Sequence, residues 1–181
     1  MACLPVPIGD PERSEIDPYF SGLWIDDGDG EFSVSYFEPY DKRTWLLTRV
    51  PVQRIDACVE DSADSEPESS SALVAMLTMR GSDCHEAENP QLYKVWLSQF
   101  GGHWFMTWEP KGSPPGVEGQ DADLSWWVFR TEKVDEDHLN LWVVEVDFEG
   151  FQDVDQTRQA FENVLEKHAG DSAMYDSEPF V

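Results

Sequence analysis

The stretch Gly101-Gly102-His103-Trp104-Phe105-Met106-Thr107-Trp108 decides the fold of this 181-residue chain. The paired glycines tolerate positive φ angles and therefore predict a tight hairpin turn. The residues that follow alternate between two faces, and this period of two is typical of a β-strand. Because both faces carry aromatic residues, we expect this strand to lie between an inner core and an outer cover.

Segments of the same kind occur on both sides of this hairpin, joined by short connections that contain Gly or Pro. They predict an antiparallel meander, which we expect to close into a mostly β barrel of about eight strands. Asp26 to Gly30 is rich in Asp and Gly and is expected to form another hairpin turn. The predicted strands are 22–25, 32–37, 44–50, 52–59 (a continuation of the third strand or a fourth), 72–79, 92–99, 103–108, 124–133 and 139–148.

One amphipathic helix is expected near the end of the chain, over residues 153–169. Asp153 with Gln156 resembles an N-terminal capping pair, and Gly170 suits the C-terminal stop. The apolar stripe between them predicts a helix packed on the outside of the barrel. The alternative is a free amphipathic helix that binds a partner.

The length and composition indicate one domain, over residues 16–170. Residues 1–15 are expected to form a Pro-rich extended arm that wraps the outside of the barrel, because proline removes a backbone donor. Residues 60–71 read as an acidic disordered loop, since they contain no large apolar residue. Residues 171–181 form a C-terminal tail.

A short helical turn is expected between Ser14 and Phe20. Its apolar side chains, Ile16, Tyr19 and Phe20, are predicted to plug one end of the barrel.

The chain is strongly acidic, with 37 Asp and Glu residues against 12 Lys and Arg residues and a formal net charge of −25. Such a charge repels phosphate backbones and anionic lipid surfaces, so no nucleic acid partner is expected. The acidity indicates either a solubility device suited to high salt or a surface for a basic protein or a cation. No apolar run approaches the ~20 residues that cross a bilayer, so no transmembrane segment is expected.

Three cysteines, Cys3, Cys58 and Cys84, form no metal-binding or redox motif and are expected to be free thiols. The chain as written reads as cytoplasmic. The alternative is a bacterial envelope lipoprotein anchored through Cys3, because Ala2-Cys3 before a Pro-rich linker looks like the mature end of such a protein.

Gly22-x-Trp24 on the first strand, after a short helical turn and before a meander and a late helix, resembles the lipocalin and wider calycin pattern over residues 16–169. The resemblance implies that Trp24 seals the closed end of the barrel and that an arginine late in the last strand packs across it. Residues 139–148 contain no arginine, and Arg130, one strand earlier, is the nearest candidate. The chain is also similar to poorly characterised bacterial envelope-type proteins with Pro-rich arms, and this similarity implies no activity.

No Walker loop, Gly-x-Ser-x-Gly elbow or HExxH motif is present, so we expect no enzyme, no catalytic residue and no cofactor. Asp26, Asp27, Asp29 and Glu31 could supply oxygen ligands to calcium. A polar hairpin tip explains the same residues, so no metal site is predicted.

The aromatic inventory supplies the candidate site, because small-molecule pockets are concave and mostly apolar. We expect a non-enzymatic barrel that binds a small apolar ligand in its interior, and a filled core is the alternative use of the same residues. A second hypothesis is an acidic interaction module that engages a basic protein partner, for example an immunity-type inhibitor of a nuclease toxin. The predicted ligand-binding residues are Trp24, Trp45, Trp96, Trp104, Trp108, Trp126, Trp142 and Arg130.

Overall fold

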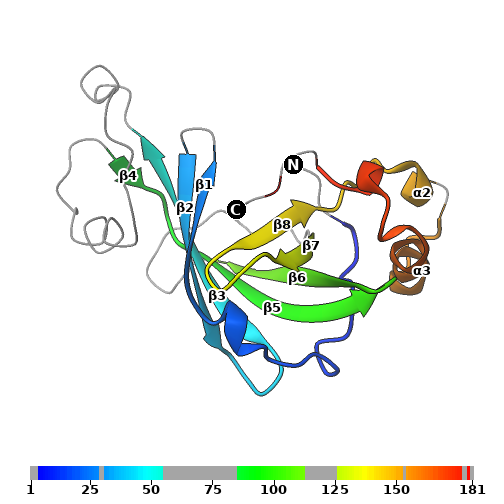
Figure 1. Cartoon of the computed structure of the whole chain (residues 1–181), viewed down its shortest axis with the longest axis horizontal. Helices are drawn as coiled ribbons and strands as arrows, with labels where there is room; N and C mark the ends of the chain where they lie inside the picture. Colours follow the sequence, from blue (N-terminus) through cyan, green and yellow to red (C-terminus); the bar gives the residue numbers. More distant parts are fainter. Residues whose placement is uncertain are drawn as a thin grey trace.

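A computed structural model describes residues 4–28, 31–54, 85–112, 126–152, 154–176 and 179. It contains one antiparallel sheet with the C-terminal helices gathered beside one part of it (Figure 1). The strands are β1 (Gly22–Gly28), β2 (Glu31–Pro39), β3 (Trp45–Arg54), β4 (His85–Ala87), β5 (Gln91–Phe100), β6 (His103–Gly112), β7 (Trp127–Lys133) and β8 (Leu139–Val143). The helices are η1 (Pro18–Phe20), α2 (Glu149–Gln152), α3 (Arg158–His168) and η3 (Ser172–Met174).

The predicted antiparallel meander is confirmed. The sheet runs in the order β1-β2-β3-β5-β6-β7-β8, and the short strand β4 pairs with the far end of β3. Within the described ranges no strand pair joins β1 to β8, so the meander forms a half-barrel. These strand pairs do not include the closure into a barrel of about eight strands that the sequence predicts.

The Gly101-Gly102 hairpin forms as predicted between β5 and β6. Both glycines have positive φ angles, 55° and 81°, as the favoured two-residue hairpin turns require. The turn also approaches α3 closely, because a Cβ atom added at Gly101 would lie 2.8 Å from the carbonyl oxygen of Glu166. The Gly101 N–H donates to the Glu166 carboxylate over 2.8 Å, which ties the hairpin to the helix.

The prediction of a turn from Asp26 to Gly30 was wrong in its first part. β1 continues to Gly28, and Asp26 pairs with Ser33 across the ladder. The Asp26 carboxylate accepts a hydrogen bond from the Ser33 hydroxyl, so an acidic residue has a partner inside the strand.

The last strand is also shorter than predicted. β8 stops at Val143, and the next residue, Val144, pairs with Tyr175 in an isolated bridge while its N–H still donates to the Val128 carbonyl. The predicted strand 72–79 lies outside the described residues.

The final helix is observed, but α3 begins later than predicted, at Arg158. Thr157 caps it, since its hydroxyl accepts from the Ala160 N–H over 3.3 Å. The predicted cap, Asp153, lies outside the described residues. The predicted apolar stripe is confirmed on the buried face of the helix, at Phe161, Val164 and Leu165.

Two cores lie on opposite faces of the sheet, as the alternation in β6 predicts. Met106 and Trp108 point into the inner core, and Phe105, the neighbour of Met106 in the strand, points into the outer core. The inner core consists of Phe20, Phe37, Trp45, Leu47, Tyr93, Val95, Leu97, Met106, Trp108, Phe129, Leu139 and Val143. The outer core consists of Leu4, Ile8, Phe105, Val128, Val144, Phe151, Phe161, Val164, Leu165, Ala169, Met174 and Tyr175.

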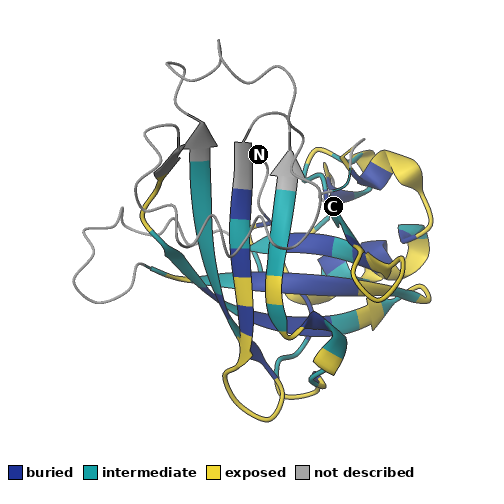
Figure 2. Ribbon diagram, turned by 60° about the vertical axis from the view of Figure 1, so that its left-hand side comes forward, coloured by how far each residue is buried: buried dark blue, intermediate teal, exposed yellow. Residues whose placement is uncertain are grey.

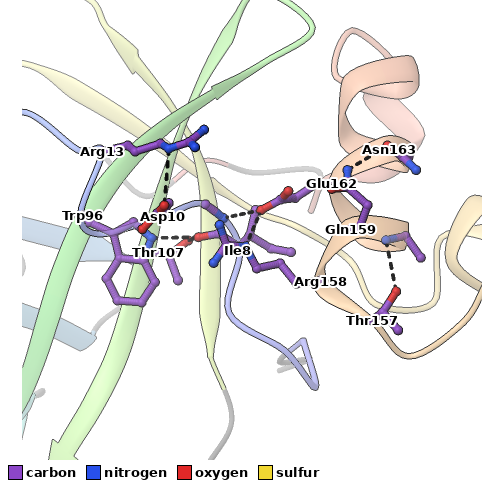
Figure 3. Close-up of polar contacts among 12 residues, drawn as sticks. Ile8, Asp10, Arg13, Trp96, Thr107, Thr157, Arg158, Gln159, Glu162 and Asn163 are labelled. Atoms are coloured by element: carbon purple, nitrogen blue, oxygen red, sulfur yellow. Dashed lines mark hydrogen bonds and ion pairs between the residues drawn. The ribbon is translucent and has the colours of Figure 1, made fainter.

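The N-terminal arm lies between the sheet and α3 (Figure 3). The Ile8 carbonyl accepts two hydrogen bonds from the sheet, from Trp96 Nε1 over 2.7 Å and from the Thr107 hydroxyl over 2.9 Å. The next residue, Gly9, donates its N–H to Glu162 of α3 over 3.0 Å. The arm is therefore fixed on both sides and forms part of the outer core.

The outer core covers only part of the sheet. None of its described residues comes from β1, β2 or β3, and on these strands Leu23 and Tyr36 are 42% and 46% exposed. Exposed and intermediate residues are correspondingly more frequent on these strands, whereas buried residues predominate beside α3 (Figure 2). The half-barrel thus has one half with covers on both faces and one half whose outer face is left open.

One end of the inner face is closed by η1, as predicted for this helical turn. Phe20 is buried in the inner core, and Ile16 and Tyr19 pack against it. Asp17 caps the turn by accepting from the Tyr19 N–H over 3.0 Å. We call this end of the half-barrel the closed end and the opposite end the open end.

Candidate ligand pocket

A pocket of about 60 Å³ lies on the inner face, on the open-end side of the plug. Most of its wall is aromatic or aliphatic, and four polar residues stand among these. The apolar lining residues are Trp24, Ile25, Phe37, Tyr93, Trp108, Trp127, Phe129, Leu139 and Leu141, and the polar ones are Asp26, Ser33, Ser35 and Arg49.

Strand register brings the lining residues together. Trp24 of β1 lies opposite Ser35 of β2, which lies opposite Arg49 of β3. Two residues further along β1, toward the open end, Asp26 lies opposite Ser33. Because side chains two residues apart share a face, these residues all project to the inner side.

Asp26, Ser33 and Arg49 form a polar cluster in this pocket. Arg49 Nε donates to the Ser33 hydroxyl over 3.2 Å, and that hydroxyl lies 3.4 Å from the Asp26 carboxylate. Arg49 Nη2 is 3.8 Å from Asp26, which is an ion-pair distance but too long for a hydrogen bond. The guanidinium is thus ion-paired with Asp26, and its described hydrogen bond uses Nε alone.

Trp108 contributes a hydrogen-bond donor that has no acceptor in the described structure. The residue is only 6% exposed, and its Nε1 atom is buried and makes no hydrogen bond. Its ring packs against Phe37, Tyr93 and Phe129, with centroid distances of 6.3, 5.5 and 4.5 Å. A buried unsatisfied donor costs about 1–3 kcal/mol, so an acceptor that reached this nitrogen would be bound favourably.

The predicted tryptophans of the site separate into four groups. Trp24 and Trp108 line the pocket, whereas Trp45 is fully buried in the inner core outside the pocket wall. Trp96 and Trp142 belong to the outer face, where Trp96 bonds the arm and Trp142 packs against the outer core. The remaining two lie elsewhere: the Trp126 backbone pairs with Leu4, and Trp104 is 50% exposed.

Arg130 lies on the outer face and not against Trp24. Its guanidinium lies over the rings of Trp142 and Tyr175, 5.2 and 5.3 Å from their centroids. The strand alternation explains this, because the neighbouring Phe129 points to the inner face.

The cation at the closed end is instead Lys133. It pairs with Asp17, and its Nζ atom lies 4.6 Å from the centroid of the Tyr19 ring and 5.2 Å from that of Phe20. Trp24 packs beside this plug, and its indole N–H donates to the Phe20 carbonyl over 3.0 Å.

Sequence reasoning missed Trp127, Tyr93 and the polar cluster. A signal for Trp127 was present, because adjacent tryptophans on a strand must point to opposite faces and Trp126-Trp127 therefore places one of them inside. Arg49 is also the only charged residue in the predicted strand 44–50. No comparable signal exists for Ser33 and Asp26, whose meeting depends on strand register.

The pocket is small compared with known ligand sites. Pockets for drug-sized ligands have volumes of about 300–1,000 Å³. A volume of about 60 Å³ holds only a few water-sized groups. Aromatic side chains thus fill most of the interior, and a ligand would place only a small group inside the pocket.

No protein-family model, curated protein or solved structure matches this chain. Across the described ranges, no helix is both long and apolar enough to span a membrane. The same residues contain no group of three or more His, Cys, Asp or Glu side chains arranged to hold a metal ion.

Proposed function

We propose that this protein is a non-enzymatic, lipocalin-like binder of a small ligand, held in the inner pocket of the half-barrel. The observation that carries the proposal is the polar cluster of Asp26, Ser33 and Arg49 in an otherwise apolar wall. A few placed polar groups in an apolar concavity are typical of small-molecule sites, where they orient the ligand.

The ligand that fits this pocket is mostly apolar, small at its inserted end, and carries a hydrogen-bond acceptor. The volume sets the size of the inserted group. The guanidinium of Arg49 sets the preference for an acceptor, and a carboxylate is the acceptor that binds it most strongly. A benzoate-like molecule has these properties and serves as the probe.

The proposal includes closure of the half-barrel. The pocket takes Trp24 from β1 and Leu139 and Leu141 from β8, so side chains of the two end strands already share one wall. A ligand bound between them would hold these ends together. Slower amide hydrogen exchange along β1 and β8 when benzoate is present would support closure, and unchanged exchange at saturating benzoate would contradict it.

The main test is a titration of the whole protein with benzoate, hexanoate and benzyl alcohol, followed by tryptophan fluorescence and calorimetry. Ser35→Leu puts a bulky side chain into the pocket and is expected to weaken benzoate binding at least tenfold. Thr48→Leu is the matched control, because Thr48 neighbours Arg49 in β3 and faces the outer side opposite Tyr36. Equal effects of the two variants, or no response to any probe, would contradict the proposal.

Arg49→Met tests the orientation of the ligand separately. A hydrogen bond to a charged group contributes about 1.5–3 kcal/mol, so the variant should lose benzoate affinity by roughly 10-fold to 100-fold. Affinity for benzyl alcohol should change by less than about threefold, because that probe carries no charge for Arg49 to bind. A uniform loss for both probes would show that Arg49 shapes the pocket and does not select the acceptor.

A further inference from the structure

A second hollow lies at the closed end, outside the plug. It is a surface groove of about 650 Å³ between the chain around η1 and strands β6 and β7. We call it the closed-end groove. Its lining residues are Glu15, Ile16, Asp17, Pro18, Phe20, Leu97, Gly102, His103, Trp104, Arg130, Thr131, Glu132 and Lys133.

Trp104 is the apolar anchor of this groove. It is 50% exposed, although tryptophan side chains in folded proteins are highly buried on average. The residue is the second of β6, and it does not belong to the inner core. Tryptophan, with tyrosine and arginine, is among the residue types that most often dominate the binding energy of a protein interface.

The two Lys and Arg residues that line the groove each lie near a carboxylate, as does the histidine of the adjoining turn. Lys133 pairs with Asp17, Arg130 lies 3.9 Å from Glu132, and His138 Nδ1 lies 2.7 Å from Asp135. Each of these pairs places one basic side chain against one carboxylate.

Further carboxylates at this end have no basic partner among the described residues. They are Glu15 in the groove, and Glu136 and Asp137 in the adjoining β7–β8 turn. That turn is held beside the plug by the Tyr19 hydroxyl, which donates to the His138 carbonyl over 2.5 Å. The groove and the adjoining turn thus carry more carboxylates than basic side chains around an exposed indole.

The pKa of Tyr19 is affected by the same carboxylates. Burial raises the pKa of its hydroxyl, and the nearby carboxylates of Asp135, Asp137 and Asp17 raise it further. These carboxylates therefore act on the plug as well as on the turn.

We infer that the closed-end groove docks a cationic polypeptide segment, with an arginine side chain stacked on Trp104 and flanked by Glu15, Glu136 and Asp137. Arginine fits better than lysine, because its guanidinium is planar, stacks on aromatic faces and is less strongly hydrated. A cation over an indole contributes about 0.5–2 kcal/mol, and unpaired carboxylates strengthen the attraction. This site is separate from the inner pocket, on the other side of the plug.

The first experiment titrates the whole protein with the peptide Gly-Arg-Gly-Arg-Gly-Arg-Gly and follows the assigned Trp104 indole N–H signal by NMR. Trp104→Ala is expected to weaken peptide binding about tenfold. Tyr36→Ala is the control, since Tyr36 is similarly exposed but lies on the outer face of β2. Equal losses in the two variants, or an unmoved Trp104 signal at saturation, would overturn the inference.

The second experiment separates this groove from the general acidity of the chain. The variant E15Q/E136Q/D137N removes three charges at the closed end, and E145Q/D147N/E149Q removes three charges around α2. The first set should weaken the arginine peptide about tenfold and the second set less than threefold. Equal weakening would assign the binding to net charge alone and overturn the inference.

Two further readouts exclude other occupants. The peptide with lysine in place of arginine should bind several-fold more weakly, because it cannot stack on Trp104 in the same way, and equal affinity would contradict the stacking arrangement. Sedimentation of the protein without peptide should show the same state for the wild type and Trp104→Ala. A dimer that Trp104→Ala dissociates would assign the groove to a second copy of the chain and overturn the inference.

Benzoate binding in the inner pocket should be unchanged in Trp104→Ala. A failure of the groove proposal is therefore distinguishable from a failure of the proposed ligand pocket.

Discussion

The two halves of the sheet differ in what covers them. Strands β5–β8 carry the shared inner core on one face and the outer core, arm and α3 on the other. Strands β1–β3 contribute to the inner core only, and among the described residues their outer face has no such cover. The polar cluster of the pocket comes entirely from this less covered half.

This difference in cover suggests that one half of the sheet provides stability and the other provides the binding site. A strand buried on both faces must be apolar on both, and it gains the hydrophobic free energy of two cores. In a strand that is buried on one face only, charged residues on the inner side near the open end cost less free energy to bury than in a strand that is buried on both faces. We therefore expect β5–β8 to carry most of the stability and β1–β3 to carry the chemistry that contacts a ligand.

The largest effect should come from truncation in the covered half. Phe105 is fully buried in the outer core, so Phe105→Ala should lower the free energy of unfolding by about 3–5 kcal/mol. Tyr36→Ala, at an exposed site on β2, should cost less than about 1 kcal/mol. Urea denaturation measures both. Similar losses would mean that the outer face of β1–β3 is covered too and would break the comparison.

Substitutions at two glycines test how the N-terminal arm is attached to the sheet. Gly9 has a φ of +76°, and a Cβ atom there would lie 1.7 Å from the Ser98 hydroxyl oxygen. Gly9→Ala combines backbone strain with overpacking and should cost roughly 2–4 kcal/mol. Gly102→Ala has a similar φ, +81°, but nothing within 4 Å of the added atom, so only strain of about 1–2 kcal/mol should remain. Equal costs in urea denaturation would show that the arm does not press on β5.

The sequence predicts much of this fold because its decisive signals are local. Gly101-Gly102 specifies a two-residue turn, and the alternation after it specifies a strand with two buried faces. The uneven cover is not local, since it depends on where the arm and α3 pack. The pairing of Asp26 inside β1 was missed for the same reason, because its partners Ser33 and Arg49 are supplied by other strands.

The candidate site was less predictable than the fold. Tryptophan content indicates an aromatic interior, but it cannot assign each ring to a face without the strand register. Trp96 and Trp142 therefore turned out to serve the outer face, while Trp127 lines the pocket. The volume of the pocket depends on how closely these rings pack, and no sequence pattern encodes that.

Alkaline pH should weaken the covered half selectively. Burial raises the pKa of Tyr175 to about 12, and Asp171 adds to this effect while Arg130 opposes it. The unfolded chain ionises at its ordinary value of 10.0, so this contribution is complete below pH 10 and is lost as the pH rises toward 12.

Tyr175→Phe should flatten that alkaline loss. It also removes the hydrogen bond to the Ala169 carbonyl, 2.6 Å away, and should cost about 1 kcal/mol at neutral pH. Denaturation at pH 8, 10 and 11 measures both effects, with Tyr36→Phe as the exposed control. An alkaline loss that persists unchanged in Tyr175→Phe would contradict this account.

Acid pH should act on the plug, which serves the inner core of both halves, and this effect should be the smallest. Burial disfavours the charged form of Asp17, but hydrogen bonds from Lys133 and the Tyr19 N–H, with the charge of Lys133, outweigh burial and lower the pKa of Asp17 below 3.8. A lowered pKa gives stability that is present above pH 4 and is lost as the pH falls through the folded value. Because the pair is partly exposed, the loss should be less than about 1 kcal/mol.

The readout is local, since the Trp24 indole N–H bonds to the Phe20 carbonyl of the plug. Its NMR signal should shift below pH 4 in the wild type and be already shifted at pH 7 in Asp17→Asn. Asp41→Asn is the matched control, because a hydrogen bond from the Arg43 N–H and hydrogen bonds from Thr44 also lower the pKa of Asp41, but these partners lie in the β2–β3 turn. If acid moved the outer-core signals of Tyr175 together with that of Trp24, the two cores would form one cooperative unit, and the division between the halves would concern exposure and not stability.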